Sequence, residues 1–128
     1  MTLSKGLIRA DIIAAKQAIE CFEEKKIRDM KNIAAYHLQQ AAEKLIKYQI
    51  YNKCNSINYK QMYTHQIEKL IIYADSLNIG VVIPDYIREQ SLTITAWEVG
   101  SRYDIGFSIR IDTLRKACHV IESWERKM

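Results

Sequence analysis

The segment from Ala34 to Tyr51, AAYHLQQAAEKLIKYQIY, constrains the fold more than any other part of the chain, because its pattern predicts one long helix with two different sides. At about 100° per residue, one side collects small and apolar residues: Ala34, Leu38, Ala41, Ala42 and Leu45. Another side collects polar residues at i, i+3, i+7 and i+10, here called the polar stripe: His37, Gln40, Lys44 and Lys47. Alanine lets a neighbouring helix approach closely, so the segment predicts a packed bundle with a polar binding face.

Composition favours helix throughout and one domain. A chain of 128 residues is most simply a single domain, residues 1–128, and 48% apolar with 27% charged residues is ordinary for a globular protein. One proline and four glycines leave little room for a β architecture with many turns. The sequence therefore predicts an all-α fold.

Apolar periodicity predicts about five helices, which would form an antiparallel up-and-down bundle because the links between them are short. The expected ranges are about 3–26, 29–51, 64–77, 84–99 and from 108 to the neighbourhood of Trp124. Thr64 and Ser108 are expected as helix caps, and Gly80 as a helix stop. Residues 81–83 are too short a β-prone run to build a sheet, and 100–106, bracketed by glycines, is expected as a loop.

The expected compartment of the protein, and the expectation that it has no cofactor, depend on features that the sequence lacks. No apolar run approaches the roughly 18 residues that cross a bilayer, so no membrane contact is expected, and Asp11 and Lys16 interrupt the apolar positions that a signal peptide would need. Cys21, Cys54 and Cys118 are an odd number with no CxxC spacing, which favours a reducing cytoplasm over disulfides or zinc. No cofactor is expected.

Common catalytic and metal-binding motifs are missing from the sequence. A di-iron bundle needs Glu-x-x-His pairs, but the residues three before His37, His65 and His119 are Ala34, Met62 and Lys116. There is no His-Glu-x-x-His, no glycine-rich phosphate loop and no Gly-x-Ser-x-Gly elbow. These absences disfavour the usual hydrolases and metalloenzymes.

After these exclusions three polar groups remain as candidate binding residues: the polar stripe, His65, and Arg102 with Tyr103. Residues 28–53 hold five Lys or Arg against two acids, which suits a phosphate-bearing or acidic partner. Structural explanations remain open for each group. His65 could pack at a helix start, Tyr103 could fill the core, Arg102 could anchor to a carboxylate such as Glu43, and Glu43 with Lys47 could be a surface ion pair.

Three segments together resemble the HEPN domain family, whose name abbreviates "higher eukaryotes and prokaryotes nucleotide-binding". They are YHLQQAAEKLIKYQI at 36–50, THQIEKL at 64–70 and SRYD at 101–104. The resemblance covers essentially the whole chain. It implies an all-α bundle, commonly homodimeric, that is often encoded beside or fused to a minimal nucleotidyltransferase.

The resemblance also implies a polar groove that binds a nucleotide or RNA. By analogy, the residues that would line or support it are Gln40, Glu43, Lys44, Lys47, His65, Arg102 and Tyr103. With His37 of the polar stripe, these are the predicted binding residues.

The chain departs from the ribonuclease members of the wider superfamily, which look like they use an Arg, a gap of four to six residues and then a His. No arginine stands at that spacing before His37, His65 or His119. Arg115 precedes His119 with a gap of three only. The expectation is therefore that no residue is catalytic, since metal-independent RNA cleavage needs an acid–base group and a phosphate-stabilising cation at fixed geometry.

Three hypotheses follow. The first is a non-catalytic binding subunit that pairs with a nucleotidyltransferase and holds a phosphate between the polar stripe and Arg102. The second is a ribonuclease toxin of a toxin–antitoxin pair, using Arg102 with His65 or Arg115 with His119. The third is a purely structural bundle whose polar face meets only water or protein.

Overall fold

The computed structural model describes residues 3–103 and 108–128, with the backbone alone for 101–103. Within these residues the chain forms seven helices, α1 (Lys5–Lys25), α2 (Asp29–Lys53), α3 (Tyr59–Met62), α4 (Ile67–Leu77), α5 (Asp85–Glu89), α6 (Ser91–Tyr103) and α7 (Ile111–Arg126). No strand occurs in the described part, so the all-α prediction is confirmed. The expected number of about five helices is not. α3 was not predicted, and the helix expected over 84–99 is divided into α5 and α6.

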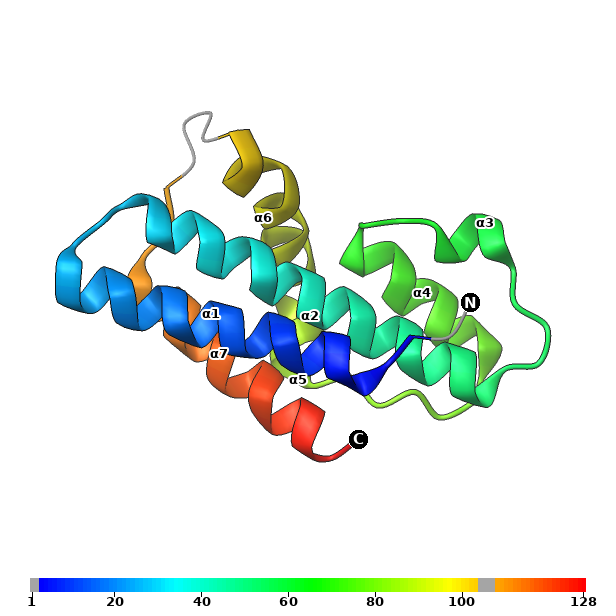
Figure 1. Cartoon of the computed structure of the whole chain (residues 1–128). Coiled ribbons are helices and arrows are strands. Elements are labelled where there is room, and N and C mark those ends of the chain that lie inside the picture. The colour runs from blue at the N-terminus through cyan, green and yellow to red at the C-terminus, as the bar shows by residue number, and fades with distance from the viewer. Residues whose placement is uncertain (1–2, 104–107) are drawn as a thin grey trace.

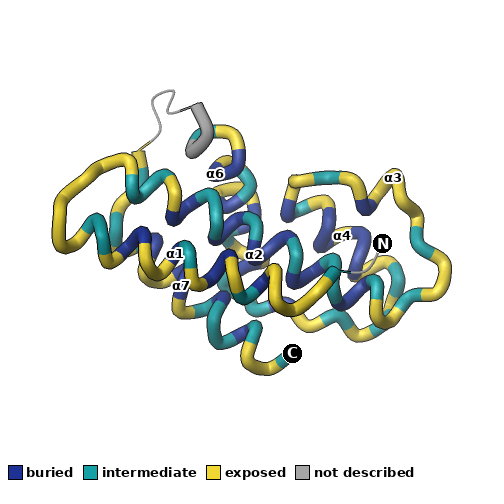
Figure 2. The backbone as a smooth tube through the Cα atoms, viewed as in Figure 1, coloured by how far each residue is buried: buried dark blue, intermediate teal, exposed yellow. Residues whose placement is uncertain are grey.

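The long helix α2 is the centre of the fold. It packs along α1 in an antiparallel pair, and α4, α6 and α7 contact it as well (Figure 1). Ala34, Ala41 and Ala42 are fully buried, as are Leu38 and Leu45. The burial of each such leucine contributes about 1.5–3 kcal/mol relative to exposure. The apolar side predicted for this helix therefore forms the core, and its buried residues recur along α2 as dark-blue segments in Figure 2.

The ends of α1 follow from local chemistry. The Ser4 hydroxyl accepts a hydrogen bond from the Leu7 amide at 3.3 Å, which satisfies one free donor of the first turn. At the other end Lys26 is left-handed, with φ 56°, and its amide donates to the Phe22 carbonyl. The expected range of about 3–26 is thus close to the observed one.

α4 starts three residues later than expected, and its N-terminus is satisfied by another helix. Thr64 accepts a bond from the Gln66 amide, but it lies before the helix. The first helical amide, that of Ile67, donates to the Thr95 hydroxyl of α6 at 2.8 Å, and Thr95 in turn donates to Glu68. Because this cap comes from 28 residues away, local sequence could not indicate it.

The segment between α4 and α5 is held by side chains rather than by a sheet. The Gln49 amide donates to the Val82 carbonyl at 2.9 Å and accepts from the Val82 amide at 2.7 Å. The buried indole of Trp124 donates to the same carbonyl. These bonds satisfy the backbone of a β-prone residue, consistent with the expectation that 81–83 builds no sheet.

Four other boundary predictions were wrong. The helix α4 ends at Leu77 because Asn78 takes the left-handed conformation (φ 51°), so Gly80 lies beyond the stop. α7 begins after Arg110, and Ser108 is not its cap. Gln90, at φ −101° and ψ 15°, interrupts the helix that was expected to run through 84–99. Helix α6 then continues to Tyr103, into the region expected as a loop, and the rest of that expected loop lies outside the described residues.

Among the described helices none is long and apolar enough to cross a membrane.

Candidate functional site

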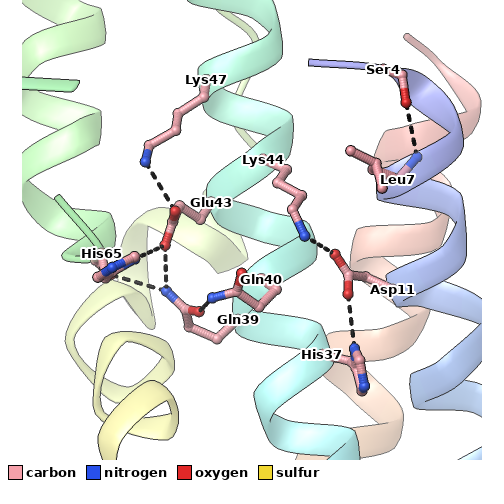
Figure 3. Close-up of polar contacts among 10 residues, drawn as sticks. All are labelled: Ser4, Leu7, Asp11, His37, Gln39, Gln40, Glu43, Lys44, Lys47 and His65. Carbon is pink, nitrogen blue, oxygen red and sulfur yellow. Dashed lines mark hydrogen bonds and ion pairs between the residues drawn. The ribbon is translucent and has the colours of Figure 1, made fainter. Parts of the chain in front are cut away.

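Asp11 of α1 gathers two donors from α2 across the α1–α2 interface, and we call these three residues the Asp11 cluster. Its Oδ1 lies 2.8 Å from Nδ1 of His37, and its Oδ2 accepts from the ammonium of Lys44 (Figure 3). The Asp11 side chain is 11% exposed. A carboxylate only accepts hydrogen bonds, so Nδ1 of His37 carries a proton in this contact and Nε2 faces any further partner.

Glu43 forms the second centre, on the side of α2 that faces the segment before α4. Its Oε1 accepts from Nε2 of Gln39 at 3.1 Å and lies 2.9 Å from Nδ1 of His65, while its Oε2 accepts from Lys47 at 3.0 Å. Gln40 extends the network by donating to Oε1 of Gln39 at 2.7 Å. We call these five residues the Glu43 cluster.

The Glu43 carboxylate is the more enclosed of the two centres. Its side chain is 6% exposed, whereas that of His65 is 65% exposed. Glu43 with Lys47 is therefore not a surface ion pair, which was one of the structural explanations left open. His65 lies before α4, not within its first turn, and its carbonyl also accepts from Gln39.

The structure divides the polar stripe between these two clusters. His37 and Lys44 turn to Asp11, while Gln40 and Lys47 belong to the Glu43 cluster, so the two groups diverge from α2 in Figure 3. The stripe is thus no row of free cations. Each lysine uses one bond on a carboxylate, and an ammonium has three N–H donors.

The side chains of Arg102 and Tyr103 lie outside the described residues. Their backbone forms the last turn of α6. Their convergence with Lys44 and His65 on one groove therefore stays a prediction.

Sequence reasoning missed Asp11 and Gln39 as members of these networks. Asp11 sits between Ile8 and Ile12 on the buried side of α1, where a charged residue interrupts an apolar stripe. Such an interruption signals a buried polar contact, because an ionised group stays buried only with partners. Gln39 was missed although its partner Glu43 is one helical turn away, and its other acceptor, the carbonyl of His65, is 26 residues away.

Arg115 and His119 line a hollow of about 260 Å³ between α1 and α7. The Arg115 guanidinium is bound there by Glu23 at 2.9 Å and by Asp112 at 2.8 Å. The thiol of Cys118 lines the same hollow, and burial raises its pKa to about 11, so it stays a neutral thiol at physiological pH. No group of three or more His, Cys, Asp or Glu in the described part of the chain could hold a metal ion.

The two clusters together can respond to an anion. Two carboxylates and two ammonium groups balance in charge within the clusters. An anion that accepts from a spare lysine N–H beside one of the imidazoles would gain a charge-assisted hydrogen bond. The arrangement therefore suits phosphate or carboxylate binding better than nucleophilic chemistry.

Comparison with known proteins agrees with the fold. The HEPN domain family model matches residues 9–126, which span all seven helices apart from the first turn of α1, and the chain belongs to this family. The family is connected with nucleotides and RNA. Neither a curated protein nor a solved structure matches the chain.

Proposed function

We propose that this chain is a non-catalytic HEPN-domain subunit that forms a homodimer, pairs with a minimal nucleotidyltransferase in the cytoplasm, and binds a nucleotide or nucleic-acid phosphate at the polar face of α2. Family membership supports the ligand class. The observation that carries the proposal is the pair of carboxylate-centred clusters on either side of α2. Each presents an imidazole and a lysine already oriented by a buried carboxylate.

The oriented donors are what a phosphate site requires. Because Asp11 and Glu43 fix Nδ1 of each histidine, Nε2 is the atom left to meet a ligand, and the ring loses little freedom on binding. His65 is the most accessible of these groups. In this proposal Arg102 supplies the planar cation that contacts the phosphate from α6, and Tyr103 supports it.

Nucleotide binding is tested by calorimetry with ATP on the intact chain. His65→Ala leaves Lys47 and Gln39 on Glu43, so the fold is kept while one charge-assisted hydrogen bond is removed, and we expect about tenfold weaker binding. Arg102→Ala is expected to abolish it. The matched control is His119→Ala, an exposed histidine on α7, which should bind as the unmodified chain does. Absence of binding by the unmodified chain would leave the structural-bundle alternative.

Partnership is tested separately, by co-expression with a minimal nucleotidyltransferase encoded by a neighbouring gene. A stable complex on size exclusion supports the proposal. Separate elution of the two chains, at concentrations where the HEPN chain is dimeric, contradicts the partner role and leaves the nucleotide site to the calorimetric test.

The ribonuclease alternative has one structural point in its favour, because Arg115 and His119 line the same hollow. Against it, Glu23 and Asp112 neutralise the guanidinium that would stabilise the phosphate. Metal-free cleavage of RNA by the purified chain, abolished in His119→Ala or His65→Ala, would establish this alternative.

A further inference from the structure

A hollow lined by none of the residues of the two carboxylate clusters lies between α3 and α4. It has a volume of about 390 Å³ and is lined by Lys60, Gln61, Tyr63, Thr64, Lys69 and Ile72. That volume falls at the lower end of the range of about 300–1,000 Å³ that is usual for ligand sites. We call it the tyrosine hollow. The helix α3 that lines it lies at the end of the molecule opposite the turn between α1 and α2 (Figure 1).

The aromatic groups at this hollow are turned toward solvent instead of the core. Tyr63 is 71% exposed and Tyr59 is 51% exposed, although tyrosine usually buries its ring. The two rings lie with centroids 6.1 Å apart at an interplanar angle of 30°. Ile72 adds an exposed apolar side chain from α4. These side chains present aromatic and apolar surface to solvent.

The charges at the hollow are of one sign. Lys60 and Lys69 lie on its two sides, no aspartate or glutamate lines it, and neither lysine has an ionic partner among the described residues. This contrasts with Lys16, Lys44 and Lys47, each of which is bound to a carboxylate. Two unpaired cations beside exposed aromatic rings match the chemistry of a nucleobase with its phosphate, because bases stack on aromatic faces and lysines neutralise the backbone.

We propose that the tyrosine hollow binds single-stranded nucleic acid, with a base stacked on Tyr63 and the adjoining phosphates held by Lys60 and Lys69. Thr64 lines the hollow, and His65, the next residue, contacts Glu43. A strand seated in the hollow therefore leads toward the Glu43 cluster. The site does not rest on the proposed partnership with a nucleotidyltransferase.

The probe is a fluorescein-labelled single-stranded RNA of 12 nucleotides, titrated with the full chain and followed by anisotropy. We expect Tyr63→Ala to weaken binding about tenfold and Tyr63→Phe to keep it, because phenylalanine preserves the stacking face. The double variant Lys60→Ala with Lys69→Ala should make the slope of log affinity against log salt shallower by about 1.4, since each phosphate that a lysine no longer neutralises accounts for about 0.7. A duplex of the same sequence should bind more weakly than the single strand, since its bases are not free to stack.

The matched control is Lys25→Ala, an exposed lysine at the C-terminal end of α1, which should leave the affinity unchanged. All substituted side chains are exposed, so circular dichroism melting should report the same fold for each.

The proposal is overturned if the unmodified chain does not bind the single strand, or if Lys25→Ala weakens binding as much as the hollow variants do. It is also overturned if binding survives Tyr63→Ala and the lysine pair but disappears in His65→Ala, which would place the RNA on the α2 face alone. A dimer that dissociates on Tyr63→Ala, without RNA binding, would instead assign the hollow to a protein interface.

Discussion

The Asp11 cluster and the Glu43 cluster use the same chemistry with different surroundings. In both, one carboxylate binds a lysine and Nδ1 of a histidine. Asp11 receives both partners from another helix, so its bonds join α1 to α2. Glu43 receives Lys47 and Gln39 from its own helix and only His65 from elsewhere, and it is the more enclosed carboxylate, at 6% against 11% side-chain exposure.

This difference suits the Asp11 cluster to a structural role and the Glu43 cluster to the binding role proposed above. The Asp11 cluster spans the main helix pair, so a ligand that drew Lys44 away would weaken that interface. The Glu43 cluster keeps two partners from α2 even when the exposed His65 turns to a ligand. The Glu43 side of α2 is therefore the better candidate for a site that opens and closes. Four carboxylates of increasing exposure test the energetic side of this comparison.

The largest loss of stability is expected for Glu43→Ala. It removes the acceptor shared by Lys47, His65 and Gln39 and leaves a largely buried ammonium without its counter-charge, at a cost of about 3 kcal/mol. The free energy of unfolding from urea titration measures this loss. The control is Glu24→Ala, an exposed residue of α1, expected within about 0.5 kcal/mol of the unmodified chain. Equal losses for the two variants would contradict the burial argument.

A smaller loss, about 2 kcal/mol, is expected for Asp11→Ala, since two hydrogen bonds to a charged group disappear. His37 and Lys44 are only partly buried and can turn to water, which limits the cost. The same urea titration applies. If Asp11→Ala proved more damaging than Glu43→Ala, joining two helices would matter more than enclosure, and the comparison would be reversed.

Glu122 of α7, whose side chain is 16% exposed, is expected to contribute to stability in a way that depends on pH. Its hydrogen bond from Lys16, helped by Arg126 and Arg9, holds the pKa of the carboxyl below its ordinary value of 4.5. The folded state then binds the proton less readily than the unfolded chain does. The stabilisation is therefore present above pH 4.5 and is lost as pH falls through the lowered pKa. Glu122→Gln should reduce the free energy of unfolding by at most about 1 kcal/mol near pH 7 and by progressively less below pH 4. A difference independent of pH would show that the charge of Glu122 contributes nothing.

The smallest effect is expected for the surface pair of Asp75 and Arg88. Both oxygens of Asp75 accept from the guanidinium, at 2.8 and 3.0 Å, and that hydrogen bonding lowers the pKa of the carboxyl. The Asp75 side chain is 50% exposed, however, so water screens the pair. Asp75→Ala should reduce the free energy of unfolding by only about 0.5 kcal/mol, which a small decrease of the thermal midpoint would show. A loss as large as that of Asp11→Ala would mean that bidentate geometry outweighs burial.

Much of the fold could be predicted because it depends on local periodicity. The spacing of Ile8, Ile12 and Ala15 marks the buried side of α1, and the alanines of α2 mark the core side of that helix. The failures occur where a boundary depends on a distant group. Thr64 has the residue type of a cap, yet α4 is capped by Thr95 from another helix. Gln90, with no Gly or Pro signal, divides the helix that was expected over 84–99.

The candidate site could be predicted only in part. The residue types of the polar stripe, Glu43 and His65 stand out in the sequence, and the structure places all of them in carboxylate-centred networks. Of their pairings only that of Glu43 with Lys47, one helical turn apart, was considered from the sequence. The pairings with Asp11 and His65 were not predictable, because they join residues 22 to 33 positions apart. The tyrosine hollow was not predicted at all, since it forms only when α3 folds against α4.

By itself the sequence predicted that this chain is all-helical, that residues 34–51 form one long helix with an apolar and a polar side, and that its segments resemble the HEPN family. Hydrophobic periodicity and short motifs are properties of neighbouring residues, so they survive without coordinates. Only the tertiary structure decided which carboxylate holds which cation. Asp11 meets Lys44 across 33 residues of chain and Glu43 meets His65 across 22, and pairings over such separations are set by how whole helices pack.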